Sequence, residues 1–69
     1  MINIGKNIKS LRHSSGFTQA YLAESLGISV QAVSKWENGT SLPDIMLLPE
    51  IARVFGVSID ELFSEDKKR

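Results

Sequence analysis

The segment SVQAVSKWENGTS, residues 29 to 41, carries amide, hydroxyl and ammonium side chains at a spacing that matches one side of a helix. Four of these polar residues fall on one arc of a helical wheel, namely Gln31, Ser34, Lys35 and Asn38. The opposite arc is apolar and centres on Trp36, which favours packing of the indole in a core over stacking on a ligand. Such polar groups hydrogen-bond to nucleotide bases or phosphates, but the same pattern is also typical of a solvated helix surface. The pattern alone leaves both interpretations open.

Few residues in the chain could support other chemistry. His13 is the single histidine and there is no cysteine, which excludes disulfides and thiolate metal sites. The sequence contains no nucleophile–base–acid set and no phosphate-binding glycine loop, so we expect neither an enzyme nor a bound cofactor or metal. No apolar run approaches the roughly 18 residues of a membrane span, and the N-terminus lacks the pattern of a signal peptide. We therefore expect a cytoplasmic protein with no membrane partner.

The charges of this 69-residue chain are segregated although they sum to zero. Residues 1–42 carry a formal net charge of +2, residues 43–66 carry −5, and the last three residues carry +3. A mildly basic half can present a favourable face to a polyanion even when the whole molecule is neutral. The length predicts one domain with a small core. We expect this domain to span residues 1–64, with 65–69 as a frayed basic tail.

Apolar spacing and glycine positions predict an all-α fold of five short helices, with no strand. In the first helix, Ile4, Ile8 and Leu11 form one apolar stripe, and Gly16 follows as a C-cap. The second helix is predicted from Thr18 to Gly27 and the third from Ser29 to Gly39. Only three residues join these two helices, and a short glycine-containing turn of this kind is typical of a helix-turn-helix.

The C-terminal part of the domain is predicted to contain a fourth helix over residues 48–55, an irregular segment 44–47 before it, and a short fifth helix capped by Ser58. Four consecutive apolar residues, IMLL at 45–48, cannot all face one small core. Part of this run is therefore a candidate homodimer surface, which we assign to Met46, Leu47, Val57 and Phe63. The alternative is an irregular segment that turns all four residues of the run inward.

Two longer stretches, LRHSSGFTQAYLAESLGISVQAVSKWENGTSLP and LPEIARVFGVSIDELF, resemble the Cro/C1-type (XRE) helix-turn-helix domains of bacteria and their phages, which are lambda-repressor-like. The resemblance covers about residues 5 to 63. It rests on motifs in order: Leu-Arg, Gly-x-Thr-Gln-x-x-Leu-Ala, Glu-Asn-Gly and Gly-Val-Ser-x-Asp-Glu-Leu. It implies a sequence-specific DNA-binding transcriptional regulator, a repressor, that binds an inverted-repeat operator in double-stranded DNA as a homodimer. The alternative is an antitoxin or phage-type regulatory module whose main partner is an unidentified protein.

The resemblance also implies roles for individual residues. The third helix would be the recognition helix in the major groove, with Gln31, Ser34, Lys35 and Val30 as base readers, although the family often has a polar residue where Val30 stands. Phosphate contacts would come from Gln19, Ser29, Asn38, Gly39, Thr40, Lys6 and Lys9. Arg12 could also reach a phosphate, but the family pattern favours a structural ion pair between Arg12 and Glu37. Tyr21 stands where the family usually has an acid, and its hydroxyl is open to a phosphate contact or to surface packing.

Overall fold

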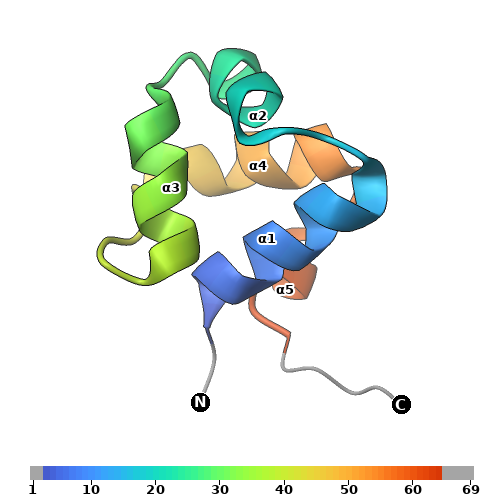
Figure 1. The fold of residues 1–69 in the computed structure, drawn as a ribbon. Coiled ribbons are helices and arrows are strands. Elements are labelled where there is room, and N and C mark those ends of the chain that lie inside the picture. The colour runs from blue at the N-terminus through green and yellow to red at the C-terminus, as the bar shows by residue number, and fades with distance from the viewer. Residues whose placement is uncertain (1–2, 65–69) are drawn as a thin grey trace.

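The computed structural model describes residues 3–64, and all of its regular elements there are helical. The order along the chain is α1 (Ile4–Ser15), α2 (Gln19–Leu26), α3 (Val30–Asn38), the 3-10 turn η1 (Ile45–Leu47), α4 (Leu48–Phe55) and α5 (Ile59–Leu62). Figure 1 shows α3 beside α1, with α2 at the top of the view and α4 running between α2 and α1. The all-α prediction with five short helices is confirmed, and the predicted basic tail 65–69 lies outside the described residues.

Short polar residues begin most of these helices, as the sequence predicted. The side chains of Thr18, Ser29 and Ser58 each accept a hydrogen bond from a backbone N–H in the first turn of the helix that follows. This contact satisfies a donor that a helix start leaves unpaired. Ser58 also forms a capping box with Glu61. The first helix begins with Asn3, whose side-chain oxygen accepts from the backbone N–H of Lys6 at 2.9 Å.

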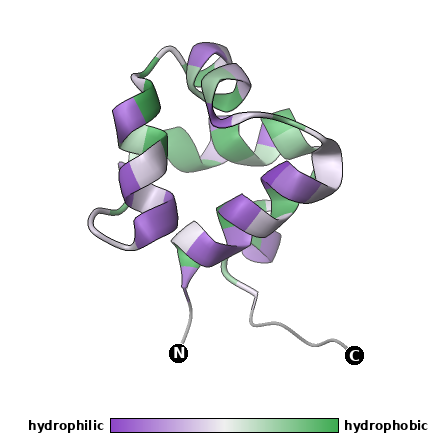
Figure 2. Cartoon of the chain, in the orientation of Figure 1, coloured by the Kyte–Doolittle hydropathy of each residue, from purple (hydrophilic) through white to green (hydrophobic). Residues whose placement is uncertain are grey.

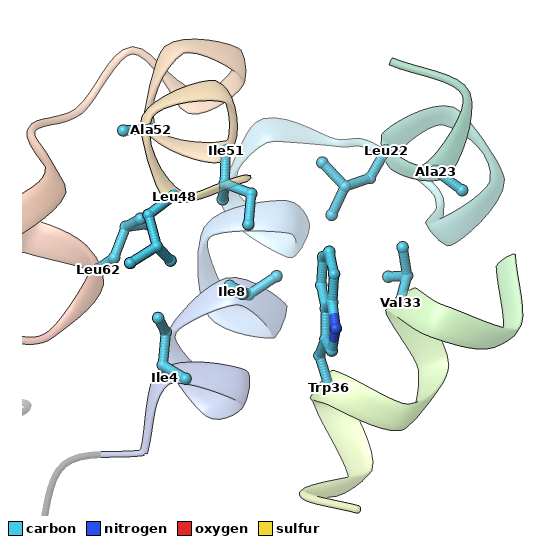
Figure 3. Close-up of a cluster of buried hydrophobic side chains, with 10 residues drawn as sticks. All are labelled: Ile4, Ile8, Leu22, Ala23, Val33, Trp36, Leu48, Ile51, Ala52 and Leu62. Carbon is cyan, nitrogen blue, oxygen red and sulfur yellow. The ribbon is translucent and has the colours of Figure 1, made fainter. Parts of the chain in front are cut away.

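Every α-helix contributes to one apolar core. Figure 3 shows the indole of Trp36 extending from α3 toward Leu22 and Ile51, so α2, α3 and α4 meet around one ring. Figure 2 shows the complementary pattern, with hydrophobic colour along much of α4 and hydrophilic stretches on α1 and α3. The prediction that Trp36 packs inside is confirmed, since the residue is only 4% exposed. The buried apolar residues are Ile4, Ile8, Leu22, Ala23, Val33, Trp36, Leu48, Ile51, Ala52 and Leu62.

The apolar run at residues 45–48 divides between the surface and the core. Ile45 and Met46 are 74% and 79% exposed, Leu47 is half-buried, and Leu48 is buried. The alternative in which all four residues turn inward is therefore wrong. The physical reason is geometric, because a single 3-10 turn followed by a helix points successive side chains in different directions.

Candidate nucleic-acid interface

The turn between α2 and α3 fixes the angle at which α3 leaves α2. Gly27 adopts a left-handed conformation with φ of 70°, which side-chain-bearing residues rarely tolerate. The backbone N–H of Ile28 then donates to the carbonyl of Ala23 at 3.0 Å, and the Ile28 side chain packs against the core. Ser29 Oγ accepts from the backbone N–H of Ala32 at 3.2 Å and starts α3. The turn is thus anchored at both ends.

The polar side of α3 faces away from the core. Gln31 and Lys35 are exposed and Ser34 is half-buried, whereas Val33 on the other side is fully buried. The side chains of Gln31, Ser34 and Lys35 form no hydrogen bond or ion pair with any residue between 3 and 64. Val30, at the start of the helix, is 43% exposed. The four predicted base readers therefore lie on one surface, and the polar groups of Gln31, Ser34 and Lys35 have no partner among residues 3–64.

A tight loop follows this surface at the C-terminal end of α3. The carbonyl of Lys35 accepts from the backbone N–H of Thr40 at 2.9 Å and from its hydroxyl at 3.2 Å. Both hydrogen-bond donors of Thr40 thus point at the Lys35 carbonyl. For the hydroxyl to donate to a phosphate instead, it must rotate away from that carbonyl. Asn38 is exposed, and its amide has no hydrogen bond to any residue from 3 to 64. Of the predicted phosphate contacts in this loop, Asn38 is the one whose side chain is ready to donate.

The predicted ion pair between Arg12 and Glu37 is present and joins α1 to α3. Arg12 Nε donates to Glu37 Oε2 at 2.7 Å, and Nη2 donates to Oε1 at 3.0 Å. Both side chains are largely buried, at 11% exposed for Arg12 and 2% for Glu37. Gln19 Nε2 also donates to Glu37 Oε1 at 2.9 Å, so the first residue of α2 is tied to the same carboxylate. This network fixes α3 against both α1 and α2.

The charges in this network favour the ionised carboxylate. Burial raises the pKa of Glu37, but hydrogen bonds from Arg12 and Gln19 and the positive charges of Arg12 and Lys9 together hold it below its usual value. The hydrogen bond to Glu37 raises the pKa of Arg12, and burial only partly offsets this. Lys9 is exposed on α1, as is Lys6, and the phosphate contact of each stays a prediction.

The predicted dimer surface is only partly exposed. Leu47 and Val57 are half-buried and pack against the core, so only part of each side chain is available to a partner, and their place in a dimer surface stays a prediction. Met46 is exposed and Phe63 is 38% exposed. Leu42, which the sequence did not single out, is 76% exposed and lines a groove of about 440 Å³ together with Trp36 and Phe63. In the sequence, Leu42 precedes Pro43 in a predicted loop, so no helical spacing predicts that it faces the core.

Two residues with structural roles gave weaker signals in the sequence. Asn7 Nδ2 donates to the carbonyls of Leu62 and Ser64, both at 2.8 Å, and thereby ties α1 to the end of α5. Gly5 is buried where α1 crosses α3. A polar or glycine residue within an amphipathic helix can be noticed in the sequence, but its partner comes from a distant segment and cannot be read from local spacing.

Other kinds of site find little support in the described part of the chain. Among residues 3–64, no three His, Cys, Asp or Glu side chains come together as a metal-binding group would require. None of the helices described here has the length and apolar character needed to cross a bilayer.

Comparison with known proteins gives consistent matches over nearly the whole chain. The sequence model of the helix-turn-helix family matches residues 8–62. YazB of Bacillus subtilis, an uncharacterised HTH-type transcriptional regulator, is 36% identical over 63 residues, which cover 91% of this chain and 91% of YazB. The antitoxin PezA of Streptococcus pneumoniae is 45% identical over 64 residues, which cover 93% of this chain but only 40% of PezA. The chain therefore spans less than half the length of PezA.

The fold also matches a solved structure over the whole chain. The crystal structure of a transcriptional regulator from Listeria innocua superposes with a TM-score of 0.85 at 28% sequence identity. The superposition covers 100% of this chain and 64% of the Listeria chain. The arrangement of helices described above is therefore shared with a regulator of known structure.

Proposed function

This chain belongs to the Cro/C1-type helix-turn-helix family of DNA-binding regulators, and we propose that it recognises a specific duplex sequence through the polar surface of α3. The observation that carries this proposal is the exposure of Gln31 and Lys35, without partners among residues 3–64, on a helix whose other side is buried. An α-helix with its side chains is about 10–12 Å across, which fits the roughly 12 Å width of the major groove.

The chemistry of each side chain suggests what it reads. The amide of Gln31 can pair with N6 and N7 of adenine, and the ammonium of Lys35 can donate to O6 and N7 of guanine. Ser34 is short and can donate or accept, and Val30 offers a methyl group that fits the methyl group of thymine. We propose these four residues as the base-reading set.

Backbone contacts would hold α3 in register. Gln19 keeps one amide hydrogen free after donating to Glu37, and Ser29 Oγ keeps its own hydrogen after accepting from Ala32. These two donors stand at the starts of α2 and α3, where unpaired backbone N–H groups and the helix dipole favour a phosphate. We propose that they contact the phosphates together with Asn38, Gly39, Thr40, Lys6 and Lys9.

Binding as a homodimer to an inverted repeat is the second part of the proposal. A single nine-residue helix reads few base pairs, and two recognition helices about 34 Å apart would occupy successive major grooves on one side of the duplex. Exposed Leu42, Ile45, Met46 and Phe63 offer apolar surface for self-association. A bound dimer can repress by occupying a promoter, so the proposed function needs no catalysis.

The similarity to PezA favours a second candidate function. An antitoxin module would use the same exposed apolar residues to bind another protein, with or without DNA. Sedimentation separates the two candidates: we expect the purified chain to self-associate if these residues form a homodimer interface, and to stay monomeric if a different protein covers them.

Selection of bound sequences from a random duplex library tests the proposed function most broadly. We expect enrichment of an inverted repeat whose half-sites are separated by about one helical turn. The affinity for the selected duplex should fall steeply with added salt, because neutralised phosphates release their counterions. Recovery of unenriched sequences, with the same affinity as random DNA, would contradict sequence-specific binding.

A further inference from the structure

Gly5 marks the point where the backbones of α1 and α3 come closest. A methyl group placed on Gly5 would overlap the carbonyl oxygen of Trp36 and lie 2.7 Å from its carbonyl carbon. Real Cβ atoms essentially never approach another atom closer than 3.0 Å. The obstacle is backbone, so no change of side-chain rotamer on α3 can relieve it. Any side chain at position 5 must therefore push the two helices apart.

Gly5 differs from the other glycines described in residues 3–64. Gly16, Gly27, Gly39 and Gly56 all have positive φ and end helices, and a methyl group on any of them would meet nothing within 4 Å. Gly5 has ordinary helical φ and is buried. The glycine is intrinsically unfavourable within a helix, so its value at this position lies in the absence of a side chain.

The carbonyl against Gly5 belongs to the C-cap of α3. The carbonyl of Trp36 accepts from the backbone N–H of Gly39 at 3.1 Å, and this bond closes α3. The loop of Asn38, Gly39 and Thr40 begins at the same point. Displacing the Trp36 carbonyl would therefore move both the end of the reading helix and the loop after it.

We propose that Gly5 is a positioning residue for DNA recognition, an inference that rests on the proposed function of α3. Its close approach sets the distance between α1 and α3, while the Arg12–Glu37 pair holds the same two helices together from a second point. With both constraints in place, the reading side chains and the loop keep one fixed position on the core. A binding site made of several side chains loses function when those side chains are misplaced by about 1 Å relative to their ligand.

The test compares Gly5→Ala with Ser10→Ala, a matched control on the exposed side of α1. The affinity of each protein is measured for the selected duplex and for a scrambled duplex of the same length. We expect Gly5→Ala to lower the ratio of these affinities by about tenfold or more, which corresponds to loss of one good base contact. Ser10→Ala should leave the ratio unchanged. A role confined to stability would lower both affinities by the same factor, and an unchanged ratio in Gly5→Ala would overturn the proposal.

Backbone amide spectra provide a readout that does not depend on DNA. Gly5→Ala should change the chemical shifts of residues 36–40, whereas shift changes confined to α1 would overturn the proposal. If Gly5→Ala is unfolded in buffer, all three proteins are compared in trimethylamine N-oxide, which favours the folded state. If the unmodified protein prefers no duplex, the proposed function fails, but the shifts of residues 36–40 still decide whether Gly5 sets the position of α3.

Discussion

Breaking the Arg12–Glu37 pair should destabilise the domain far more than breaking a surface ion pair. We consider Arg12→Met, Glu37→Met and the double variant. Removing one partner of a buried pair typically costs about 3–5 kcal/mol, because the other charge stays buried without its counterion. Glu37 in Arg12→Met keeps the hydrogen bond from Gln19, and Arg12 in Glu37→Met keeps its bond to the Phe17 carbonyl at 2.9 Å. We therefore expect each single variant to lose about 3 kcal/mol of its free energy of unfolding, near the lower limit of this range.

The double variant should lose much less free energy of unfolding than the sum of the losses in the two single variants. Replacing both charges by apolar side chains leaves no unpaired charge, and such replacements are often neutral or stabilising. We expect the double variant to lie within about 1 kcal/mol of the unmodified protein, which gives a coupling free energy of about 5 kcal/mol. The total free energy of unfolding of a 69-residue chain is about 3–10 kcal/mol, so each single variant loses a large part of it.

Together with the unmodified protein, these variants make a double-mutant cycle. Urea denaturation followed by circular dichroism gives the free energy of unfolding of all four proteins. In thermal unfolding, a loss of about 3 kcal/mol corresponds to a fall in Tm of at least about 12 °C for a domain of this size. If the single variants are already unfolded at 25 °C, the cycle is repeated in trimethylamine N-oxide. The reasoning would be refuted if the loss in the double variant equalled the sum of the two single losses within about 0.5 kcal/mol. It would also be refuted if each single variant lost less than about 1 kcal/mol, as in exposed ion pairs.

The remaining predictions concern binding, acid stability and assembly. Gln31→Ala and Lys35→Ala should each weaken binding to the selected duplex by about 1–3 kcal/mol with an unchanged circular dichroism spectrum; unchanged affinity in fluorescence anisotropy would contradict the reading surface. The pKa of Glu37 is lowered in the folded state, so the stability it contributes is complete above its unfolded pKa and is lost as the pH falls through the folded value. The urea midpoint should therefore fall more between pH 6 and about pH 3 in the unmodified protein than in Glu37→Gln, and equal falls would assign acid sensitivity to other carboxylates. Met46→Lys should give a monomer in sedimentation equilibrium without loss of stability, since Met46 is 79% exposed; a mass unchanged from that of a self-associated parent would exclude Met46 from the interface.

Much of the fold could be predicted because its signals are local. The N-caps at Thr18, Ser29 and Ser58 and the glycines that end the helices act within one turn of chain, and each lies where the sequence placed it. The irregular segment before α4 was also predictable, since Pro49 is compatible with only the first turn of a helix.

The exposure of Leu47 and Val57 and the contact made by Gly5 could not be predicted in the same way. Each depends on how two elements pack, and hydrophobicity alone does not say which apolar residue of a short segment reaches the core. The overlap between a Gly5 methyl group and the Trp36 carbonyl depends on the distance between α1 and α3. That distance is set by the sum of the core contacts and is not encoded at any one position.

Titration of the isotope-labelled protein with its selected duplex, followed by backbone amide spectra, tests the central claim most directly. If the polar surface of α3 reads DNA, the largest shift changes should fall on residues 29–35 and 38–40 and on Gln19. A scrambled duplex should give smaller changes at the base-reading positions. Changes concentrated in α4 and α5, or identical changes with both duplexes, would contradict the assignment of α3 as the reading helix.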